Sequence, residues 1–262
     1  MKVANVALGN SDARRRLRDW LTRRCPDIVT LQKIGPGGLF PESQVRNAGY
    51  QGCFLHHGEN HLGVAVLVRR DFLNRRDRSL SRVLYPELPD PDICQPRFPN
   101  ESRFLTVSIG DLWVSSVYAP YGPASLRKRQ AIERRVAWLN RLRNNIRFAG
   151  RDRWILCGDF NVKPDGRPPW KGYYSQDEKD ALEELKRLGL RDLYREAHPH
   201  PEEKPGHTRG HSEKYPHGTS RLHLILASDS LARRLRSARM DLDRSLWPRR
   251  DAPPVIVDLD DI

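Results

Sequence analysis

The sequence lacks a long apolar run, has few cysteines and carries fewer acidic than basic residues. No segment reaches the roughly 18 consecutive apolar residues of a membrane-spanning helix, and the first residues, MKVANVALGNSDARRR, contain no apolar segment followed by a small-residue cleavage site. The four cysteines, Cys25, Cys53, Cys94 and Cys157, form no C-x-x-C pair, and isolated thiols of this kind commonly pack as small hydrophobic groups. We therefore expect a cytoplasmic protein with no membrane partner.

The sequence also lacks a clear metal-ligand motif. Several histidines fall in one loop-rich region: His198, His200, His207, His211 and His217. They have neither partnered cysteines nor the His-x-x-x-His spacing of a helical metal site. Their spacing alone does not indicate zinc.

The charge balance favours a polyanionic partner. Lysine and arginine number 46 against 33 aspartates and glutamates, which gives a formal net charge of +13. Basic side chains that contact phosphates release condensed counterions, so such a surplus is typical of proteins that bind nucleic acid. Arginine outnumbers lysine heavily, and a genome rich in G and C produces that bias without selection for binding. Nucleic acid is the favoured interpretation, with a compositional origin as the alternative.

Short apolar runs alternate with amphipathic stretches, which is the pattern of an α/β protein. Helices are expected at 11–24, ended by Pro26, within 125–145 and over 176–188. Strands are expected at 27–32, 63–68, 103–109, 112–118, 154–157, 221–227 and 254–259. The strands at 103–109 and 112–118 flank a Gly-Asp turn and should form a hairpin, so the sheets should be mixed. We expect a single domain over residues 1–262, with the proline-rich segments 86–99 and 199–216 as surface loops.

One predicted strand ends in polar residues. Residues 154–161, WILCGDFN, are apolar for four positions and then present Asp159 and Asn161. With one residue between them on an extended segment, both side chains project to the same side. They either take part in chemistry or stabilise a turn through backbone hydrogen bonds.

The order of eight segments resembles the exonuclease III branch of the endonuclease/exonuclease/phosphatase superfamily. These are MKVA with the following helix ending in DWL, PDIVTLQ (26–32), GVAVLV, VYAPYG (117–122), CGDFN (157–161), LGLRDLYR (188–195), SRLHLILAS (220–228) and APPVIVD (252–258). The resemblance implies a four-layered α/β/β/α sandwich of two mixed sheets flanked by helices. It also implies magnesium-assisted hydrolysis of a phosphodiester, commonly in DNA beside an abasic site or from a DNA end.

The resemblance assigns roles to individual residues. Asp159 matches the family position that prepares the nucleophile, and Asn161 the one that holds the scissile phosphate. Tyr118 matches the tyrosine of the family's active cleft, and Asn5 the asparagine of the first strand. Asp251 matches the aspartate near the carboxyl end.

Other family positions are occupied by different residues. Lys33 replaces the glutamate that is the principal metal ligand, His223 replaces an aspartate, and Ala252 replaces a histidine. Arg209 lies in the loop that is rich in aromatic residues in the family, and Arg221 precedes His223 by two positions. An ammonium group ~4.5 Å from a magnesium ion would repel it by on the order of 7 kcal/mol at an effective dielectric constant of about 20. We expect no resident metal ion or other cofactor.

Two functions follow from these substitutions. In the first, the protein is a catalytically degenerate member that binds nucleic acid, DNA more readily than RNA, with room for a protein partner. Its phosphate-binding residues would be Asn5, Lys33, Arg209, Arg221 and His223, beside the remnant catalytic residues Asp159, Asn161, Tyr118 and Asp251. In the second, it is an active DNA phosphodiesterase in which Asp159, Asp251 and Asn5 hold Mg²⁺ or Mn²⁺. Lys33 itself either binds phosphate or extends into solvent without a role.

Overall fold

The structure is a computed structural model of the 262-residue chain. It describes residues 1–8, 11–35, 42–55, 63–75, 79–83, 103–121, 128–149, 152–165, 175–201, 220–247 and 252–260. Several features of the sequence analysis lie outside these ranges: Arg209, Asp251, Cys94, three of the clustered histidines and nearly all of both proline-rich segments. The predictions made for them stay predictions.

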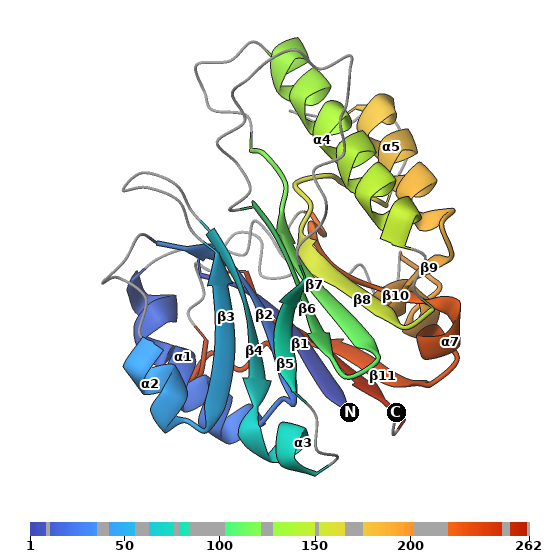
Figure 1. The fold of residues 1–262 in the computed structure, drawn as a ribbon. Helices are drawn as coiled ribbons and strands as arrows, with labels where there is room; N and C mark the ends of the chain where they lie inside the picture. The colour runs from blue at the N-terminus through green and yellow to red at the C-terminus, as the bar shows by residue number, and fades with distance from the viewer. Residues whose placement is uncertain are drawn as a thin grey trace.

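Two six-stranded sheets form the centre of the molecule (Figure 1). Sheet A has the order β11 (Leu235–Met240), β12 (Val255–Leu259), β1 (Lys2–Ala7), β2 (Ile28–Ile34), β4 (Gly63–Arg69) and β3 (Tyr50–Leu55). Sheet B has the order β5 (Leu80–Val83), β6 (Phe104–Ile109), β7 (Leu112–Tyr118), β8 (Trp154–Asp159), β10 (His223–Ser228) and β9 (Leu190–Asp192). The β1–β2 and β7–β8 pairs are parallel and the other pairs are antiparallel. Both sheets are therefore mixed, as predicted.

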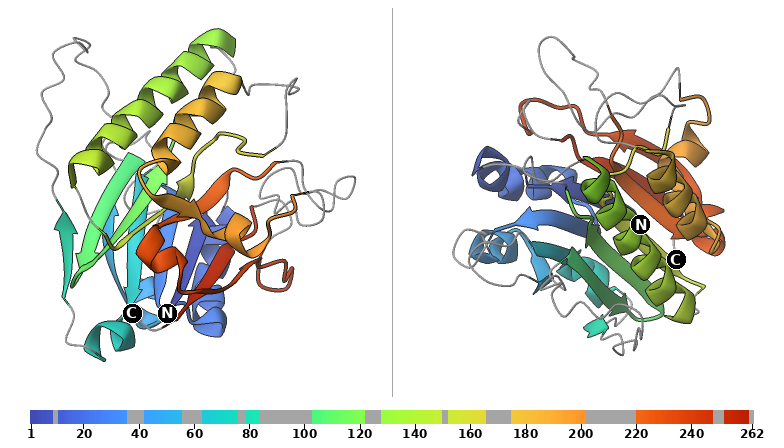
Figure 2. Two further views of the ribbon diagram at one scale, coloured as in Figure 1. Left: turned by 90° about the vertical axis from the view of Figure 1, so that its right-hand side faces the viewer. Right: turned by 90° about the horizontal axis from the view of Figure 1, so that it is seen from above.

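Helices cover the outer face of each sheet. Helices α1 (Ser11–Arg24) and α2 (Glu42–Asn47) flank sheet A, while α4 (Lys128–Ala149) and α5 (Gln176–Lys186) flank sheet B (Figures 1 and 2). Three short helices, α3 (Arg70–Asn74), α6 (Leu193–Ala197) and α7 (Asp229–Ala232), follow strands β4, β9 and β10. No helix in the described ranges is long and apolar enough to cross a membrane.

Three apolar clusters hold these four layers together. The central cluster contains Val66 and Val257 of sheet A with Val107 and Ile155 of sheet B, so it lies between the sheets. A second cluster packs α1 and α2 on sheet A, and a third packs α4 and α5 on sheet B. Alternate residues of each inner strand therefore face opposite cores. The predicted four-layered α/β/β/α sandwich is confirmed.

The strong periodic elements appear near the predicted positions. The predicted helix at 11–24 matches the bounds of α1, and the hairpin of β6 and β7 forms around the Gly-Asp turn. The predicted strand at 154–157 extends two residues further, so Asp159 is the last residue of β8. The prediction missed short or more polar elements, among them β3, β5, β9 and β11, because their sequences carry little alternation.

Candidate functional site

Four polar or aromatic side chains form a row across one end of sheet B. Asp159 of β8 is paired with Tyr118 of β7 and with His223 of β10. On β6, Phe104 is paired with Val117, so Arg103 lies beside Tyr118 at the same end of the sheet. Directly opposed residues on neighbouring strands project from the same face. Leu105, Ile155 and Ile225 share this alternation and lie in the cluster between the sheets, so the row faces sheet A.

Asp159 is a buried carboxylate held by donors from both sheets. Its Oδ2 lies 2.9 Å from Nζ of Lys33 and 3.3 Å from Nε2 of His223. Its Oδ1 accepts a hydrogen bond of 3.1 Å from the backbone N–H of Asn161. We call Lys33, Arg103, Tyr118, Asp159 and His223 the Asp159 cluster.

Lys33 reaches Asp159 because its strand is irregular. By simple alternation, Lys33 would share the outer face with Val29 and Leu31, which pack toward α1. The pairing of β2 with β4 shifts between Gln32 and Ile34, and Lys33 has a φ of +64°. A bulge of this kind re-aims a side chain, and here it turns Lys33 toward sheet B. The Lys33 side chain is 26% exposed, against 2% for Asp159, so it forms the solvent-facing part of this ion pair.

The surroundings of Asp159 keep its side chain ionised. Burial by itself would raise the pKa of this carboxyl, but the charges and hydrogen bonds of Lys33 and His223 outweigh burial and hold the pKa well below its usual range. A carboxylate this strongly stabilised as an anion is a weak general base, because its drive to accept a proton is small.

Asn161 is shaped by the turn that follows β8. It has a φ of +50°, a left-handed conformation that asparagine tolerates better than most residues. Its Nδ2 donates to the carbonyl oxygen of Ala119 at 2.8 Å, and the residue is 5% exposed. Asp159 and Asn161 thus do stabilise a turn, while Asp159 also joins the ion pair with Lys33. Whether Asn161 holds a phosphate stays a prediction.

Tyr118 has a cation from each sheet against its ring. Nζ of Lys33 lies 5.6 Å from the ring centroid, and Cζ of Arg103 lies 4.7 Å from it. Nη1 of Arg103 also donates to the carbonyl oxygen of Tyr118 at 3.3 Å. Burial raises the pKa of the Tyr118 hydroxyl, with the charge of Lys33 opposing it. Tyr118 therefore stays a neutral phenol near pH 7, and its ring contacts the charged groups of Lys33 and Arg103.

Asn5 connects the two sheets and does not face solvent. Its Nδ2 donates to the carbonyl oxygens of Gly158 and Leu224, at 3.0 and 3.2 Å. Its Oδ1 accepts from Thr30 Oγ1 and Gln32 Nε2, at 3.0 and 2.8 Å. The residue is fully buried. Its predicted contact with phosphate is therefore not available in this structure, because its donors and acceptor are occupied inside the protein.

Gly158 allows strand β8 to lie close to Val117 of the neighbouring strand β7. An added Cβ at this position would lie 2.3 Å from both the side chain and the carbonyl oxygen of Val117 on the neighbouring strand. A side chain would therefore push β8 away from β7 and displace Asp159, the next residue. The glycine in the sequence CGDFN is required by packing within sheet B.

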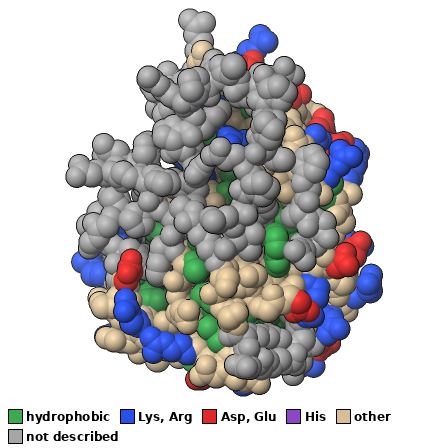
Figure 3. Space-filling view, in the orientation of Figure 1, with side chains coloured by type: hydrophobic (Ala, Val, Ile, Leu, Met, Phe, Trp, Pro, Cys, Tyr) green, Lys and Arg blue, Asp and Glu red, His purple; other side chains and the backbone are tan. Residues whose placement is uncertain are grey.

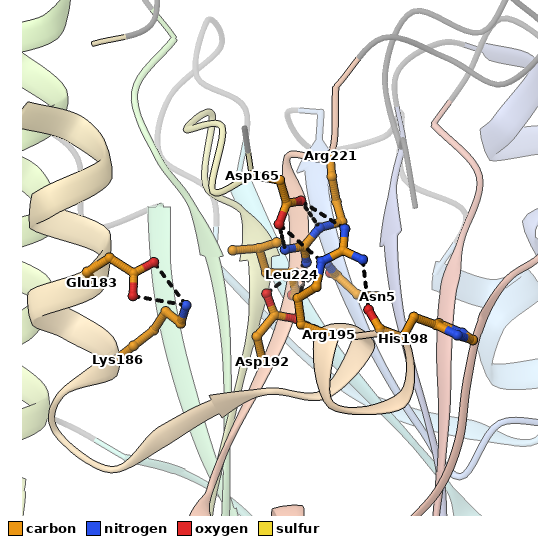
Figure 4. Close-up of polar contacts among 9 residues, drawn as sticks. All are labelled: Asn5, Asp165, Glu183, Lys186, Asp192, Arg195, His198, Arg221 and Leu224. Carbon is orange, nitrogen blue, oxygen red and sulfur yellow. Dashed lines mark hydrogen bonds and ion pairs between the residues drawn. The ribbon is translucent and has the colours of Figure 1, made fainter. Parts of the chain in front are cut away.

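Arg221 belongs to a buried ion-pair network shown in Figure 4. Its Nε lies 2.6 Å from Oδ2 of Asp165, and its Nη1 lies 2.8 Å from Oδ2 of Asp192. Arg195 contacts the same Asp165 carboxylate through Nε and Nη2, each at 3.1 Å. The Arg221 side chain is only 2% exposed. Its predicted phosphate contact is not available here, because its guanidinium is enclosed by two carboxylates.

The described residues of the site do not fit a divalent cation. Mg²⁺ and Mn²⁺ prefer several carboxylate or carbonyl oxygens, whereas the Asp159 cluster has one carboxylate beside an ammonium and an imidazole. No group of three or more His, Cys, Asp or Glu side chains in the described ranges is placed to hold a metal ion. Ala252 has no polar side chain that could add to this set.

Arg103 was missed by the sequence analysis, although the sequence contains a signal for it. In RFLTVSI, Arg103 shares its alternation with Leu105, Val107 and Ile109, which all face the core between the sheets. A basic residue on the apolar face of a strand is unusual and indicates a special role. By contrast, no local pattern in the sequence predicts that Asp165 pairs with Arg195 and Arg221. These arginines lie 30 and 56 positions after Asp165.

Comparison of the sequence with models of known protein families identifies the family of this chain. A sequence model of the endonuclease/exonuclease/phosphatase family matches residues 3–248, nearly the whole chain. The chain belongs to the endonuclease/exonuclease/phosphatase family.

Individual relatives agree with this assignment. The chain is 25% identical over 193 residues to Recombination repair protein 1 of Drosophila melanogaster, a match that covers 70% of this chain and 26% of that protein. It therefore spans about a quarter of that curated relative. Among solved structures, an AP endonuclease from Archaeoglobus fulgidus has a TM-score of 0.77 with 22% identity, covering 100% of both chains. A 3′-5′ exonuclease from Neisseria meningitidis has a TM-score of 0.76 with 23% identity, covering 99% of this chain and 100% of that one. These structures share the fold.

Proposed function

We propose that the protein binds nucleic acid through phosphate contacts at the Asp159 cluster and does not hydrolyse it by a divalent-metal mechanism. The observation that carries this proposal is the ion pair between Lys33 Nζ and Asp159 Oδ2, at 2.9 Å. The ammonium occupies the space beside the carboxylate that a metal ion would need. Two cations cannot share that space without strong repulsion.

The same ion pair also makes Asp159 a poor group for activating a water molecule. Hydrolysis needs a group that orients or deprotonates water. Both oxygens of Asp159 already accept hydrogen bonds or ion-pair contacts within the protein, and the side chain is 2% exposed. Lys33 and His223 also hold its pKa low, so it gains little by accepting a proton.

The cluster retains features suited to an anion. Lys33 and Arg103 supply two positive charges against the single carboxylate of Asp159. The Lys33 side chain is 26% exposed, so its ammonium can be reached from solvent, whereas the Asp159 side chain is 2% exposed. An ammonium has three N–H donors, so one lysine can contact a carboxylate oxygen and a phosphate oxygen at the same time. The net charge of +13 supports electrostatic attraction of a polyanion.

The comparisons support DNA as the nucleic acid to test first. One solved structure of the same fold is a 3′ phosphatase from Neisseria bound to a product DNA hairpin, with a TM-score of 0.73 and 22% identity over 99% of each chain. Two further structures of this fold are the AP endonuclease from Archaeoglobus fulgidus and an AP endonuclease from Leishmania major. We infer that duplex DNA with an abasic analogue is an informative probe for this chain.

The test compares binding and cleavage of one labelled duplex that carries an abasic analogue, in magnesium, in manganese and in a chelator. We expect binding that persists in the chelator and weakens as salt rises, with no cleavage in any condition. Lys33→Glu should weaken binding by about tenfold, because it replaces a phosphate-binding charge with a repelling one.

A matched control separates this local effect from a general loss of charge. Arg70→Glu makes the same two-unit change on exposed helix α3, at the opposite end of sheet A. It should alter affinity much less than Lys33→Glu. Metal-dependent cleavage that Asp159→Ala abolishes would overturn the proposal, and so would equal affinities of the two charge-reversal variants.

A further inference from the structure

Helix α4 carries a row of basic and aromatic side chains beside its buried face. The buried residues of this helix recur at three- and four-residue spacing: Ala131, Arg135, Leu139, Leu142 and Ile146. Arg134, Trp138 and Arg141 repeat that spacing one position earlier, so they form the neighbouring row on the helix surface. Arg141 is exposed, and Arg134 and Trp138 are partly exposed. We call Arg134, Trp138 and Arg141 the α4 stripe.

The α4 stripe lies on the flank of α4 that faces away from α5. Arg141 and Arg143 stand on either side of the buried Leu142, each about 100° from it around the helix axis. Nη1 of Arg143 lies 3.8 Å from Oε2 of Glu184 in α5. Helix α5 therefore runs along the Arg143 flank, and Figures 1 and 2 show it on one side of α4.

The two flanks differ in charge. Helix α5 contains two lysines and five acidic residues, Asp177, Glu178, Asp180, Glu183 and Glu184. The acidic residue of α4, Glu133, is paired with Arg129 at 2.8 Å. Arg135 and Arg143 also pair with carboxylates, whereas no carboxylate in the described ranges pairs with Arg141. A polyanion is therefore repelled from the α5 flank and attracted to the α4 stripe.

The α4 stripe begins near the Asp159 cluster. Phe104, which follows Arg103, and Trp138 both pack against the apolar cluster beneath α4. Burial lowers the pKa of the Arg103 guanidinium, and the positive charge of Arg134 acts in the same direction, so these two charges interact. From Arg134 to Arg141 the helix rises by roughly 10 Å, or about three nucleotides of a stacked strand. The α4 stripe thus continues the positive charge of the cluster along the outer layer of the protein.

The residue types of the α4 stripe suit an unpaired strand. Guanidinium groups bind phosphate oxygens, and an aromatic ring provides a surface on which an unpaired base stacks. Trp138 stands between the two arginines, four residues after Arg134 and three before Arg141. In a duplex each base already stacks on its neighbours, so the tryptophan ring adds affinity only for a single strand.

We propose that the α4 stripe binds a single-stranded segment of nucleic acid that extends from the Asp159 cluster. Arg134 and Arg141 contact its phosphates, and Trp138 stacks on one of its bases. This inference rests on the proposed function, because the Asp159 cluster anchors the nucleic acid from which the single strand extends. It adds a second surface, on the helical layer outside sheet B.

The experiment compares three labelled duplexes that share one sequence and one abasic analogue. One is blunt, and the others carry a single-stranded 3′ or 5′ tail of about eight nucleotides. Binding is followed by fluorescence anisotropy in a chelator at a series of salt concentrations. We expect one of the tails to raise affinity about tenfold over the blunt duplex, because it adds a stacked base and two phosphate contacts.

Variants on α4 test the individual residues. Arg141→Gln should reduce the salt dependence, d log K/d log[salt], by about 0.7 for the tailed duplex and leave the blunt duplex unchanged. Trp138→Leu keeps an apolar side chain over the cluster beneath α4 but removes the stacking surface, so the ratio of tailed to blunt affinity should fall severalfold. Trp138→Phe should retain part of this ratio, because it keeps an aromatic ring. Partial loss of folded protein weakens both complexes equally and leaves the ratio unchanged.

The matched control lies on the same helix. Arg147 is exposed and stands four residues after Arg143, on the α5 flank. Arg147→Gln removes the same charge and should leave the ratio of tailed to blunt affinity unchanged. Equal effects of Arg141→Gln and Arg147→Gln would overturn the α4 stripe in favour of diffuse attraction.

The outcomes separate this inference from the proposed function. If neither tail raises affinity while the blunt duplex still binds in a salt-dependent manner, the α4 stripe is wrong and the proposed function stands. If Trp138→Leu keeps the full ratio, the assignment of a stacked base to Trp138 is wrong. If no duplex binds at any salt concentration, both proposals fail.

Discussion

At the scale of single residues, Lys33 and His223 determine the charge around Asp159. Lys33 is the decisive one, because its ammonium contacts the only carboxylate in the described cluster, at 2.9 Å. His223 adds a second contact to the same carboxylate oxygen at 3.3 Å. Lys33 has a positive φ at the bulge of β2, and this irregular backbone accompanies the contact of its side chain with Asp159.

Removal of the Asp159 charge should strengthen nucleic-acid binding. Asp159 competes with phosphate for Lys33, so Asp159→Asn should raise affinity by about fivefold in a chelator, measured by anisotropy. A residue that holds a catalytic metal would give the opposite sign in magnesium. Asp152→Asn makes the same change at an exposed position before the other end of β8 and should have little effect. Weaker binding by Asp159→Asn, with an unchanged melting temperature, would contradict the competition.

At the scale of secondary-structure elements, the network around Asp165 fixes the turn that carries Asp159 and Asn161. Arg221 lies two residues before His223, and Arg195 lies in helix α6 (Figure 4). Both guanidinium groups contact the Asp165 carboxylate in a bidentate manner. The turn after β8 is thereby joined to α6 and to the start of β10. Within this network Arg221 and Asp192 are buried, whereas Asp165 and Arg195 are partly exposed.

This network should make stability depend on pH in the acid range. Burial alone would raise the pKa of Asp165, but hydrogen bonds from Arg221 and Arg195 lower it from 3.8 to about 2. Because the folded-state pKa lies below the unfolded one, the carboxylate contributes stability that is fully present above about pH 4 and is lost as the pH falls toward 2. Asp165→Asn should therefore cost about 2 kcal/mol at pH 7 and flatten the pH dependence in that window.

Urea unfolding at a series of pH values measures this effect. The control is Asp19→Asn, an exposed carboxylate on α1 whose removal should leave both the stability and its pH profile close to those of the wild type. An Asp165→Asn profile parallel to the wild-type profile between pH 4 and pH 2 would show that this ion-pair network is not linked to protonation of Asp165.

At the scale of the whole molecule, a buried polar contact joins the two sheets beneath the site. Asn5 of sheet A donates to two carbonyl oxygens of sheet B and accepts from Thr30 and Gln32 of its own sheet. Gln32 also donates to Ser116 Oγ of sheet B at 3.1 Å. These contacts fix how the sheets lie against each other, and therefore how Lys33 meets Asp159.

The surplus positive charge is a second property of the whole molecule. In the view of Figure 3, the basic side chains of the described residues lie mainly along the margins and alternate with acidic ones. No large patch of one sign stands out among the described residues on that face.

Loss of the Asn5 amide should destabilise the whole protein. Asn5→Leu keeps a similar side-chain size but leaves two carbonyl oxygens and two donors buried without their partner. We expect a loss of roughly 2–4 kcal/mol in the free energy of unfolding, measured in urea. Asn144→Leu, at an exposed position of α4, is the matched control. A loss below about 0.5 kcal/mol for Asn5→Leu would mean that these hydrogen bonds add little net stability.

Local pattern made much of the fold predictable. Helix α1 and the hairpin of β6 and β7 have clear periodicity, and strands β4, β8 and β12 contain short apolar runs. Strands β3, β5 and β9 are defined by pairing with partners elsewhere in the chain, so their own residues gave no sufficient signal. The sequence singled out Asn5 and Arg221 as site residues but could not predict that their side chains point into the protein. Their burial depends on carbonyl oxygens and carboxylates that lie far away along the chain.

The sequence by itself determined the fold family, the alternating strands that bring Tyr118, Asp159 and His223 to one end of a sheet, and the presence of a lysine at position 33, directly after the predicted strand at 27–32. Each of these depends on the identity of a residue or on a period of two along a strand. Tertiary structure alone decided that the bulge turns Lys33 onto Asp159, that Arg103 and Lys33 meet at one ring, and that Asn5 and Arg221 are enclosed. Those outcomes depend on how two sheets pack, and packing joins residues whose separation along the chain carries no local signal.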